Sequence, residues 1–472
     1  MKTITFPGPE TMPEVPLAAS TALCTDHYEL TALSAALHSG VAYRAATFEL
    51  FALVLPAGRR YGVVGGIGRL VGAIEAFRFG PAELNFLAGL LDDDTLDYLA
   101  GWRFTGDIDA YAEGELYFPG SPVVSVRAPF GEAVVLETLA LSVLNYDSAV
   151  ASAAARMHAA AAGVPLIEAG SRRTHDQAAV AAARAAYVCG FDVTSNLEAG
   201  RTHSVPTAGT TMHAFILAHD TEDAAFAAQY DTFGTDTTLL VDTYDLATAI
   251  RTGVRLANER GAPGPAGIRI DSGDLATGAH RARVLLDCLG ATRTSIVVSG
   301  DLDEHRIADL VTSGAPIDRF MAGTALVTGS GAPTAGFVYK LVEIADADGI
   351  PCSVAKCSAA KAYIAGTKAA ARALDASGAA TAEIVTTDLA AVAVAVAAGH
   401  VRPLLTPLLR AGHVVADTSV ATARAHHARV RAELTHSALS PAPGDPALPT
   451  ITDLADVSGA HIDSLTPQEA TR

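Results

Sequence analysis

Short apolar runs alternate with helical stretches rich in Ala, Leu and charged residues through the middle of the chain, from about residue 146 to residue 340. Each run ends in polar residues or glycine, and a helical stretch follows. This repeated order predicts a parallel α/β array, whose active site lies at the carboxyl ends of the strands. The apolar runs are 165–167, 239–241, 268–270 and 296–298.

The two flanks of this region have a different pattern. Residues 26–143 mix helical stretches with β-like ones, which predicts an α+β domain. Past residue 340 the chain returns to short strand-like segments, and a basic helical stretch follows at 421–434. We expect His426 and His427 on that helix to be solvated.

Composition and charge narrow the class of protein. Of the 472 residues, 50% are hydrophobic, which is enough for a large core, so the chain is globular. Asp and Glu outnumber Lys and Arg by 51 to 33, and the net charge of −18 opposes approach to nucleic acid. The most apolar run, 389–399, is about half of the roughly 20 residues that a membrane-spanning helix needs. We therefore expect neither nucleic acid nor a membrane as partner.

The cysteines and the N-terminus bear on the compartment. The five cysteines are scattered and lack the spacing of a metal site, which is typical of a reducing compartment. The first residues lack the basic-then-apolar layout of a secretory signal. Both observations predict a cytoplasmic protein.

Arginines and carboxylates at the predicted strand ends suit a ligand with phosphate and hydroxyl groups. Arg172 and Arg173 can hold an anion through their guanidinium forks. Arg269 precedes Asp271 by two residues, so both side chains lie on one face of a strand and can contact one ligand. A structural ion pair between them at the barrel rim explains the same local pattern.

Two glycine turns follow apolar stretches, at Gly300-Asp301 and Gly323-Thr324, where backbone N–H groups can hold a phosphate. Each turn by itself also fits an ordinary loop. The chain has no G-x-x-x-x-G-K-[ST] loop, no dinucleotide fingerprint and no G-x-S-x-G elbow. These absences exclude a P-loop nucleotidase, a Rossmann dehydrogenase and an α/β-hydrolase.

A histidine follows a turn of small residues in Gly209-Thr210-Thr211-Met212-His213. His213 can act as a base or as a nucleophile that accepts a phosphoryl group. A lone histidine is more often structural, so the local pattern leaves both interpretations open.

Taken together and in order, these clusters resemble the nicotinate phosphoribosyltransferase family over about residues 20–435. No single string is decisive, but their order over some 400 residues makes coincidence implausible. The strings are TDHYELT (25–31), FELF (48–51), LET (136–138), ARM (155–157), SRRTH (171–175), GFDVTSN (190–196), GTTMH (209–213), VDTYD (241–245), RIDSGDL (269–275), SGDLDE (299–304), GTALVT (323–328) and VYKLV (338–342).

The resemblance implies an α/β fold, with an irregular TIM-like barrel joined to an α+β domain that N-terminal and C-terminal segments form together. It also implies a homodimer with a shared active site. The expected division is a flexible N-terminus at 1–20, the N-terminal α+β domain at 21–145, the catalytic barrel at 146–340, a C-terminal segment packing on the α+β domain at 341–440 and a flexible tail at 441–472.

The reaction that the resemblance implies joins nicotinate to 5-phosphoribosyl 1-diphosphate, giving nicotinate mononucleotide and pyrophosphate for NAD biosynthesis. Mg²⁺ and coupled ATP hydrolysis are implied with it. Loss of pyrophosphate leaves an oxocarbenium-like centre, so the site needs anions near the ribose and cations on the leaving group.

The resemblance further implies the roles of eleven residues. Three of these residues, Arg269, Asp271 and His213, are catalytic. Asp271 faces the ribose or the metal, and ATP transiently phosphorylates His213. Among the substrate-binding residues, Tyr28 stacks on the pyridine ring from the partner subunit, and Arg172 with Arg269 holds the carboxylate and diphosphate oxygens. The others are Ser195, Thr210 and the 5′-phosphate ligands Gly300, Asp301, Gly323 and Thr324.

Ser195 bears on the choice of pyridine. The related nicotinamide enzyme has an aspartate at the aligned position, which accepts a hydrogen bond from an amide and repels a carboxylate. A neutral, donating Ser195 favours the acid. The alternatives are a phosphoribosyltransferase of the same fold for nicotinamide or quinolinate, and a non-catalytic relative that binds pyridine nucleotides.

Two positions near the expected site depart from the family pattern. Ala169 stands where the family usually has Phe, so one half of an aromatic sandwich is missing, which is worth about 1 kcal/mol. Ala153 replaces a lysine and removes a cation near the expected site. Both changes affect substrate affinity more than the class of reaction.

Overall fold

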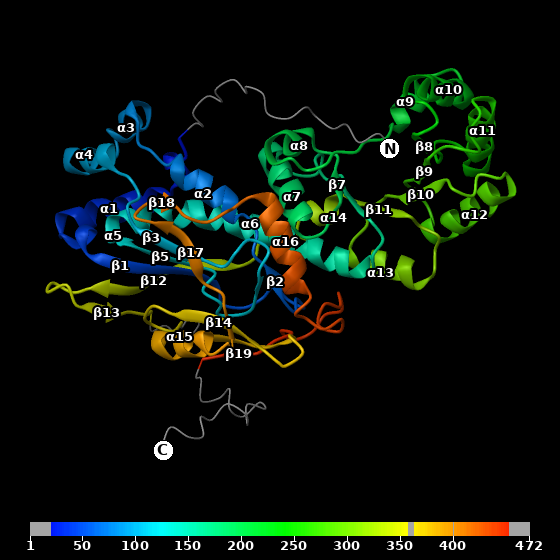
Figure 1. Cartoon of the computed structure of the whole chain (residues 1–472). Helices are drawn as coiled ribbons and strands as arrows, with labels where there is room; N and C mark the ends of the chain where they lie inside the picture. Colours follow the sequence, from blue (N-terminus) through cyan, green and yellow to red (C-terminus); the bar gives the residue numbers. More distant parts are fainter. Residues whose placement is uncertain (1–19, 357–362, 400, 453–472) are drawn as a thin grey trace, which may run out of the picture. The chain divides into compact units, whose positions relative to one another are not determined.

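The computed structural model describes residues 20–356, 363–399 and 401–452, and the expected flexible ends lie mostly outside these residues. Contacts within the chain divide it into two compact units (Figure 1). The first unit contains residues 150–333 and 440–442, and the second contains the other described residues.

The first unit is built on a parallel sheet with the strand order β7-β6-β11-β10-β9-β8, a half-barrel with β7 and β8 at its ends. The predicted parallel α/β array is therefore confirmed. Its strands are β6 (Leu166–Glu168), β7 (Val193–Thr194), β8 (Thr238–Leu240), β9 (Gly267–Ile270), β10 (Ser295–Val298) and β11 (Arg319–Ala322).

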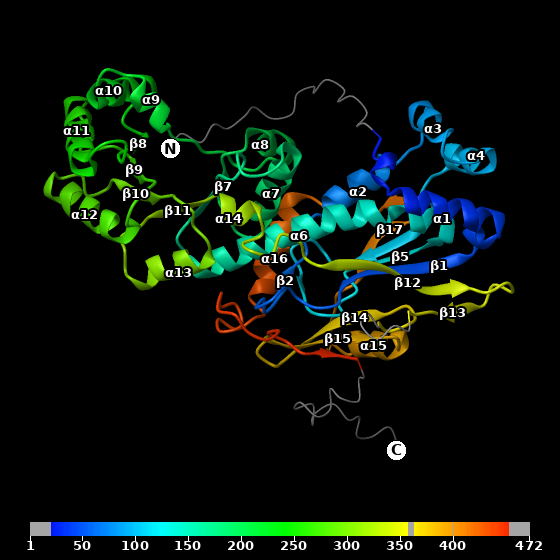
Figure 2. The ribbon, with the colours of Figure 1, turned by 180° about the vertical axis from the view of Figure 1, so that it is seen from behind.

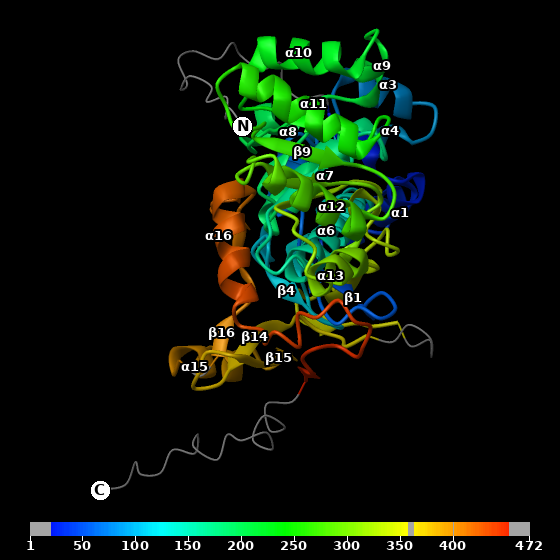
Figure 3. The ribbon, with the colours of Figure 1, turned by 90° about the vertical axis from the view of Figure 1, so that its right-hand side faces the viewer.

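Helices connect these strands. Three of them, α10, α11 and α12, lie side by side along the outer face near β9 (Figure 3). The apolar residues of the strands, such as Ile268 and Ile296, are buried, which explains why each strand reads as an apolar run. The helices are α7 (Asp176–Val188), α8 (Leu197–His203), α9 (His213–Leu217), α10 (Glu222–Phe233), α11 (Leu246–Glu259), α12 (Leu275–Cys288), α13 (Glu304–Thr312) and α14 (Thr324–Val327).

The second unit combines segments from both flanks of the half-barrel, in agreement with the expected α+β domain. Its largest sheet has the order β13-β12-β1-β5-β3-β17-β18, and its strands pair antiparallel. These strands are β1 (Ala45–Ala52), β3 (Asp107–Ala110), β5 (Val124–Pro129), β12 (Phe337–Ala345), β13 (Pro351–Ser353), β17 (Thr406–Arg410) and β18 (His413–Val414).

A smaller sheet with the order β16-β14-β15-β19 carries helix α15 (Leu389–Ala397) against it (Figure 2). Its strands are β14 (Ala369–Leu374), β15 (Ala380–Thr386), β16 (Val401–Pro403) and β19 (Thr450–Ile451). Strand β19 falls in the segment expected to be a flexible tail, yet it pairs in parallel with β15, and Thr450 donates a hydrogen bond to the Pro119 carbonyl at 2.8 Å.

The remaining elements of the second unit are helical, apart from the two-stranded sheet of β2 (Gly62–Val63) and β4 (Leu116–Tyr117). Its helices are α1 (His27–His38), α2 (Ile67–Glu75), α3 (Pro81–Leu87), α4 (Asp93–Gly101), α5 (Phe130–Ala133) and α16 (Val420–Arg431), with 3-10 turns at Ala22–Cys24, Val41–Tyr43 and Val134–Leu136.

Helix α6 (Glu137–Ala160) belongs to a helical stretch, Phe130–Ala160, that is long and apolar enough to cross a membrane. Of its most apolar window, 67% is buried inside the protein. Val135 and Leu144 in this stretch belong to the hydrophobic core of the second unit. The stretch is therefore a core helix, which its apolar composition also requires.

The two histidines of α16 are not solvated as expected. The His427 side chain is buried, and its Nδ1 lies 2.8 Å from the Gly114 carbonyl oxygen. His426 Nε2 lies 2.9 Å from a carboxylate oxygen of Glu115, which Arg402 also contacts at 2.7 Å. Burial acts to raise the pKa of Glu115, but the bonds from His426 and Arg402 prevail and lower it to about 2. His426 of this basic helix and Arg402 of β16 therefore stabilise the negative charge of the buried Glu115 carboxylate.

Candidate active site

Three strands of the half-barrel are each followed by a motif with two aspartates. The later aspartate of each motif, Asp245, Asp274 or Asp303, caps the next helix by accepting its backbone N–H. The earlier aspartates lie at the strand ends, where Asp242 and Asp271 come together. The repeated Asp spacing of the sequence therefore serves both helix capping and the site.

His213 begins α9 and faces both of these carboxylates. Its Nδ1 lies 3.1 Å from the Thr243 hydroxyl. Its Nε2 lies 3.9 Å from Asp242 Oδ1 and 3.8 Å from Asp271 Oδ2. The His213 side chain is 39% exposed, so a ligand can reach it. A histidine in this position presents Nε2 as a nucleophile beside two oxygen ligands for a cation.

Asp242 connects the ends of β8 and β9. Its Oδ2 accepts hydrogen bonds from the Asp271 backbone N–H at 2.9 Å and from the Ser272 hydroxyl at 2.7 Å. Its Oδ1 is buried and accepts no hydrogen bond from the described residues. Because buried carboxylate oxygens are normally paired, this atom points to a cation or donor that a ligand supplies. Asp271 in turn accepts a hydrogen bond from the Ser299 hydroxyl.

Arg269 does not form the rim ion pair with Asp271 that the sequence also allowed. Its guanidinium donates to the Thr210 hydroxyl at 2.7 Å. Burial lowers the pKa of Arg269. The negative charges of Asp271 and Asp242 act to raise this pKa, and the positive charge of Arg172 acts to lower it further. The Arg269 Nε–H is buried and has no acceptor among the described residues. This arrangement leaves Arg269 able to bind an anionic ligand.

The first glycine turn is packed tightly against the backbone of Asp271. Gly300 has φ +107°, and a Cβ built on it would lie 2.4 Å from the Asp271 carbonyl oxygen. The next residue, Asp301, has φ +48° and is exposed. Only glycine fits at position 300, since any side chain would push Asp271 away.

The second glycine turn lies against the loop that follows β6. A Cβ on Gly323 would lie 3.2 Å from the Ala169 carbonyl oxygen, and the Ala169 N–H donates to the Ala322 carbonyl at 2.8 Å. Thr324, the first residue of α14, is exposed. The 5′-phosphate role of both turns stays a prediction.

Arg172 and Ser195 are exposed on two neighbouring loops. The loops are joined because Asn196 donates to the Ser171 hydroxyl at 3.0 Å and the Ser195 N–H donates to the Glu168 carbonyl at 2.8 Å. Ten of the eleven predicted residues therefore belong to the half-barrel unit, and contacts join Thr210 to Arg269, His213 to Asp271 and Gly300 to Asp271.

Tyr28 is the exception, because it belongs to the second unit. It lies in the first turn of α1, with 55% of its surface exposed. Partial burial and the nearby carboxylates of Glu137 and Glu29 raise its pKa to about 12. The hydroxyl is therefore neutral at physiological pH, and its role in stacking stays a prediction. Ala153, expected near the site, is fully buried in α6.

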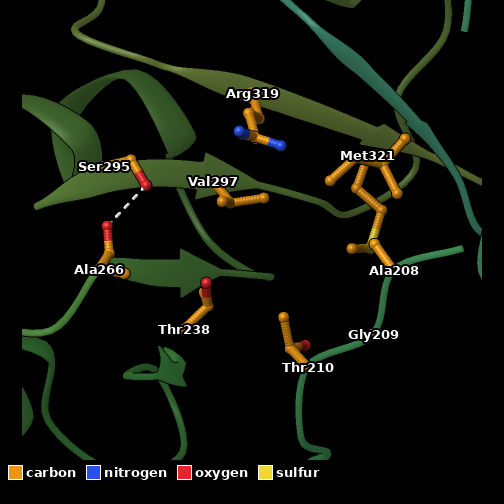
Figure 4. Close-up of a pocket in the computed structure, with 10 residues that line it drawn as sticks. Ala208, Gly209, Thr210, Thr238, Ala266, Ser295, Val297, Arg319 and Met321 are labelled. Atoms are coloured by element: carbon orange, nitrogen blue, oxygen red, sulfur yellow. Dashed lines mark hydrogen bonds between the residues drawn. The ribbon is translucent and has the colours of Figure 1, made fainter. Parts of the chain in front are cut away.

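A cavity of about 120 Å³ lies inside the half-barrel next to Thr210 (Figure 4). Its walls include Ile167, Val297 and Met321, and Arg319 projects into it from the start of β11. Arg319, Asp242 and Thr243 had no assigned role in the sequence. Asp242 carried a signal, since it follows β8 as Asp271 follows β9.

Comparison with known proteins gives several matches. Residues 23–145 match the family model described as nicotinate phosphoribosyltransferase N-terminal domain. A Mycobacterium tuberculosis protein named nicotinate phosphoribosyltransferase pncB1 is 54% identical over 91% of this chain and 95% of its own. The Bacillus subtilis nicotinate phosphoribosyltransferase is 38% identical over 69% of this chain and 67% of its own.

Two solved structures show a similar fold. The crystal structure of human nicotinic acid phosphoribosyltransferase has a TM-score of 0.77 at 24% identity, covering 93% of this chain and 99% of its own. A nicotinate-nucleotide pyrophosphorylase from Pyrococcus furiosus has a TM-score of 0.69 at 20% identity, covering 89% and 99%.

Proposed function

The chain belongs to the nicotinate phosphoribosyltransferase family, and from this membership we propose how its residues carry out the reaction. The enzyme transfers the phosphoribosyl group of 5-phosphoribosyl 1-diphosphate to nicotinate, giving nicotinate mononucleotide and pyrophosphate for NAD biosynthesis. The observation that supports our assignment of roles is the position of His213, with Nε2 within 3.9 Å of two carboxylates and on the same sheet edge as Arg269.

In this proposal the chain's own residues position charge around the breaking C1–O bond. Arg172 binds the diphosphate leaving group, and Asp271 faces the ribose, whose ring gains positive charge as pyrophosphate departs. Asp242 Oδ1 and Asp271 Oδ2 are oxygen donors that fit Mg²⁺, and the first of them is buried without a donor. Mg²⁺, when bound there, neutralises charge on the diphosphate.

His213 couples the reaction to ATP in the same proposal. Its Nε2 attacks the γ-phosphorus of ATP, so an N–P bond forms, a P–O bond breaks and ADP leaves. Water later cleaves the N–P bond and releases inorganic phosphate. The hydrogen bond between Nδ1 and Thr243 holds the ring so that Nε2 faces the ligand.

We place Tyr28 in the site of a second subunit, because its ring is exposed and it belongs to the unit without the carboxylates. A homodimer with shared sites follows. The described cysteines form no disulfide bond with one another, which supports our proposal of a cytoplasmic enzyme.

One pair of variants tests both proposals. His213→Asn should abolish phosphate incorporation from labelled ATP and leave only slow, uncoupled transfer; unchanged labelling would refute the phosphohistidine. Tyr28→Ala should weaken nicotinate binding. Mixed and refolded with His213→Asn, it should regain ATP-coupled activity, because some heterodimers hold one site with both residues intact. No recovery, with heterodimers present, would contradict a shared site.

A further inference from the structure

The register of the parallel sheet places a second arginine level with Arg269. Val297 in β10 pairs with Arg269 in β9 on one side and with Arg319 in β11 on the other. Paired residues of neighbouring strands share a face of the sheet, so all three side chains point the same way. Two strand spacings separate the Arg269 and Arg319 backbones by about 10 Å.

A cavity extends between Arg319 and Thr210, whose hydroxyl accepts the hydrogen bond from Arg269. The cavity beside Thr210 is lined by Val297, Arg319 and Met321, and Arg319 projects into it in Figure 4. Towards the start of the strands Thr238, Ala266 and Ser295 line the cavity. Gly267 lies between two of these side chains, because a Cβ built on it would meet the hydroxyls of both Thr238 and Ser295 at 2.9 Å.

The layer of residues towards the carboxyl ends of the strands contains the catalytic groups. Asp271 lies two residues beyond Arg269 on the same face of β9 and contacts Ser299 beyond β10. A pyridine ring whose nitrogen faces this layer has its C3 substituent directed away from it, because the two positions are meta. The substituent then lies at the level of Arg269 and Arg319.

Resting on the proposed function, we propose that Arg319 is a specificity-determining residue that binds the carboxylate of nicotinate together with Arg269. The buried Arg269 Nε–H, which has no acceptor, gains one from the carboxylate. Arg319 approaches the carboxylate from the opposite side, across Val297. Two guanidinium groups in a partly desolvated cavity favour a full negative charge over a neutral amide. Arg172, exposed on its loop, is left for the diphosphate.

The test compares Arg319→Gln and Arg319→Lys with the wild-type enzyme, using nicotinate and nicotinamide as separate substrates. Arg319→Gln should raise KM for nicotinate at least about tenfold, the loss of one charge-assisted hydrogen bond, with kcat changed by less than about threefold. The preference for nicotinate over nicotinamide in kcat/KM should fall by a similar factor. Arg319→Lys should recover part of the preference, because it keeps the charge.

Arg293→Gln is the matched control, since Arg293 is an exposed arginine that lines a different cavity before β10. Its kinetics should equal those of the wild type. If the wild-type enzyme makes no product from nicotinate, the proposed function fails. If the wild type is active and both Arg319 variants keep its KM and its preference, only the role of Arg319 is refuted. If Arg319→Gln does not fold, Arg319→Met is the neutral variant in its place: a raised KM for nicotinate supports the role of Arg319, and an unchanged KM overturns it.

Discussion

Replacing Gly300 by alanine should damage the site through the backbone of its neighbour. The new Cβ would lie 2.4 Å from the Asp271 carbonyl oxygen, whereas real Cβ atoms essentially never come closer than 3.0 Å. The turn or Asp271 must therefore move by about 0.6 Å or more. The φ of +107° adds strain of about 1–3 kcal/mol for a residue other than glycine.

The displacement reaches the chemistry directly. Asp271 Oδ2 lies 3.8 Å from His213 Nε2, and the other oxygen accepts the Ser299 hydroxyl. A misplacement of this size in a positioned catalytic group lowers kcat by up to about 100-fold. We expect Gly300→Ala to lose about 10- to 100-fold in kcat for nicotinate and to unfold at a lower temperature than the wild type.

A control separates the clash from the strain. Gly314 also has a positive φ, +68°, but a Cβ built on it meets nothing within 4 Å. Gly314→Ala should therefore lose about 1 kcal/mol of stability and no activity. Steady-state kinetics and thermal unfolding of both variants give the answer. If the two variants are equally active and equally stable, the close packing of Gly300 on Asp271 has no functional consequence, and our reasoning is wrong.

Two further predictions concern substrate affinity and pH. Ala169→Phe should lower KM for nicotinate about fivefold by restoring a stacking partner worth about 1 kcal/mol, and a higher KM would show that the pocket suits a bulkier ligand. Glu115 has a pKa lowered to about 2 in the folded protein, against 4.5 for the free side chain. Its contribution to stability, about 3 kcal/mol, is therefore complete above pH 4.5 and is lost as the pH falls towards 2. Glu115→Gln should be less stable at neutral pH and lose less stability over this acid range, in denaturant titrations at each pH. An identical pH dependence in both proteins would contradict the buried contacts with Arg402 and His426.

Much of the half-barrel could be predicted because parallel strands buried on both faces are continuous apolar runs. The runs at 165–167, 239–241, 268–270 and 296–298 overlap β6, β8, β9 and β10. The apolar stretch before Gly323 is β11, and it is less uniformly apolar than the other runs because it begins with Arg319, whose charged side chain projects into the cavity. Strand β7 has two residues and is too short to leave a periodic signal.

The histidines show where local pattern misleads. His213 follows a turn of small residues and His427 lies in a basic stretch, but neither local pattern shows what the side chain contacts. In the structure His213 faces two carboxylates at the strand ends, whereas His427 is buried against the Gly114 carbonyl, more than 300 residues earlier in the chain. Contacts between such distant segments depend on strand order, which the hydrophobic pattern does not contain.

The sequence by itself determined the family, the reaction and the parallel α/β architecture, since these depend on motifs and periodicities that are local in the chain. Only the tertiary structure decided which polar groups meet. Asp242 and Asp271 converge because β8 and β9 are neighbours, and Arg269 and Arg319 share one level because both strands pair with β10 at Val297. The physical reason is register: a strand's residues are assigned to a face and a level by the partner against which they form hydrogen bonds.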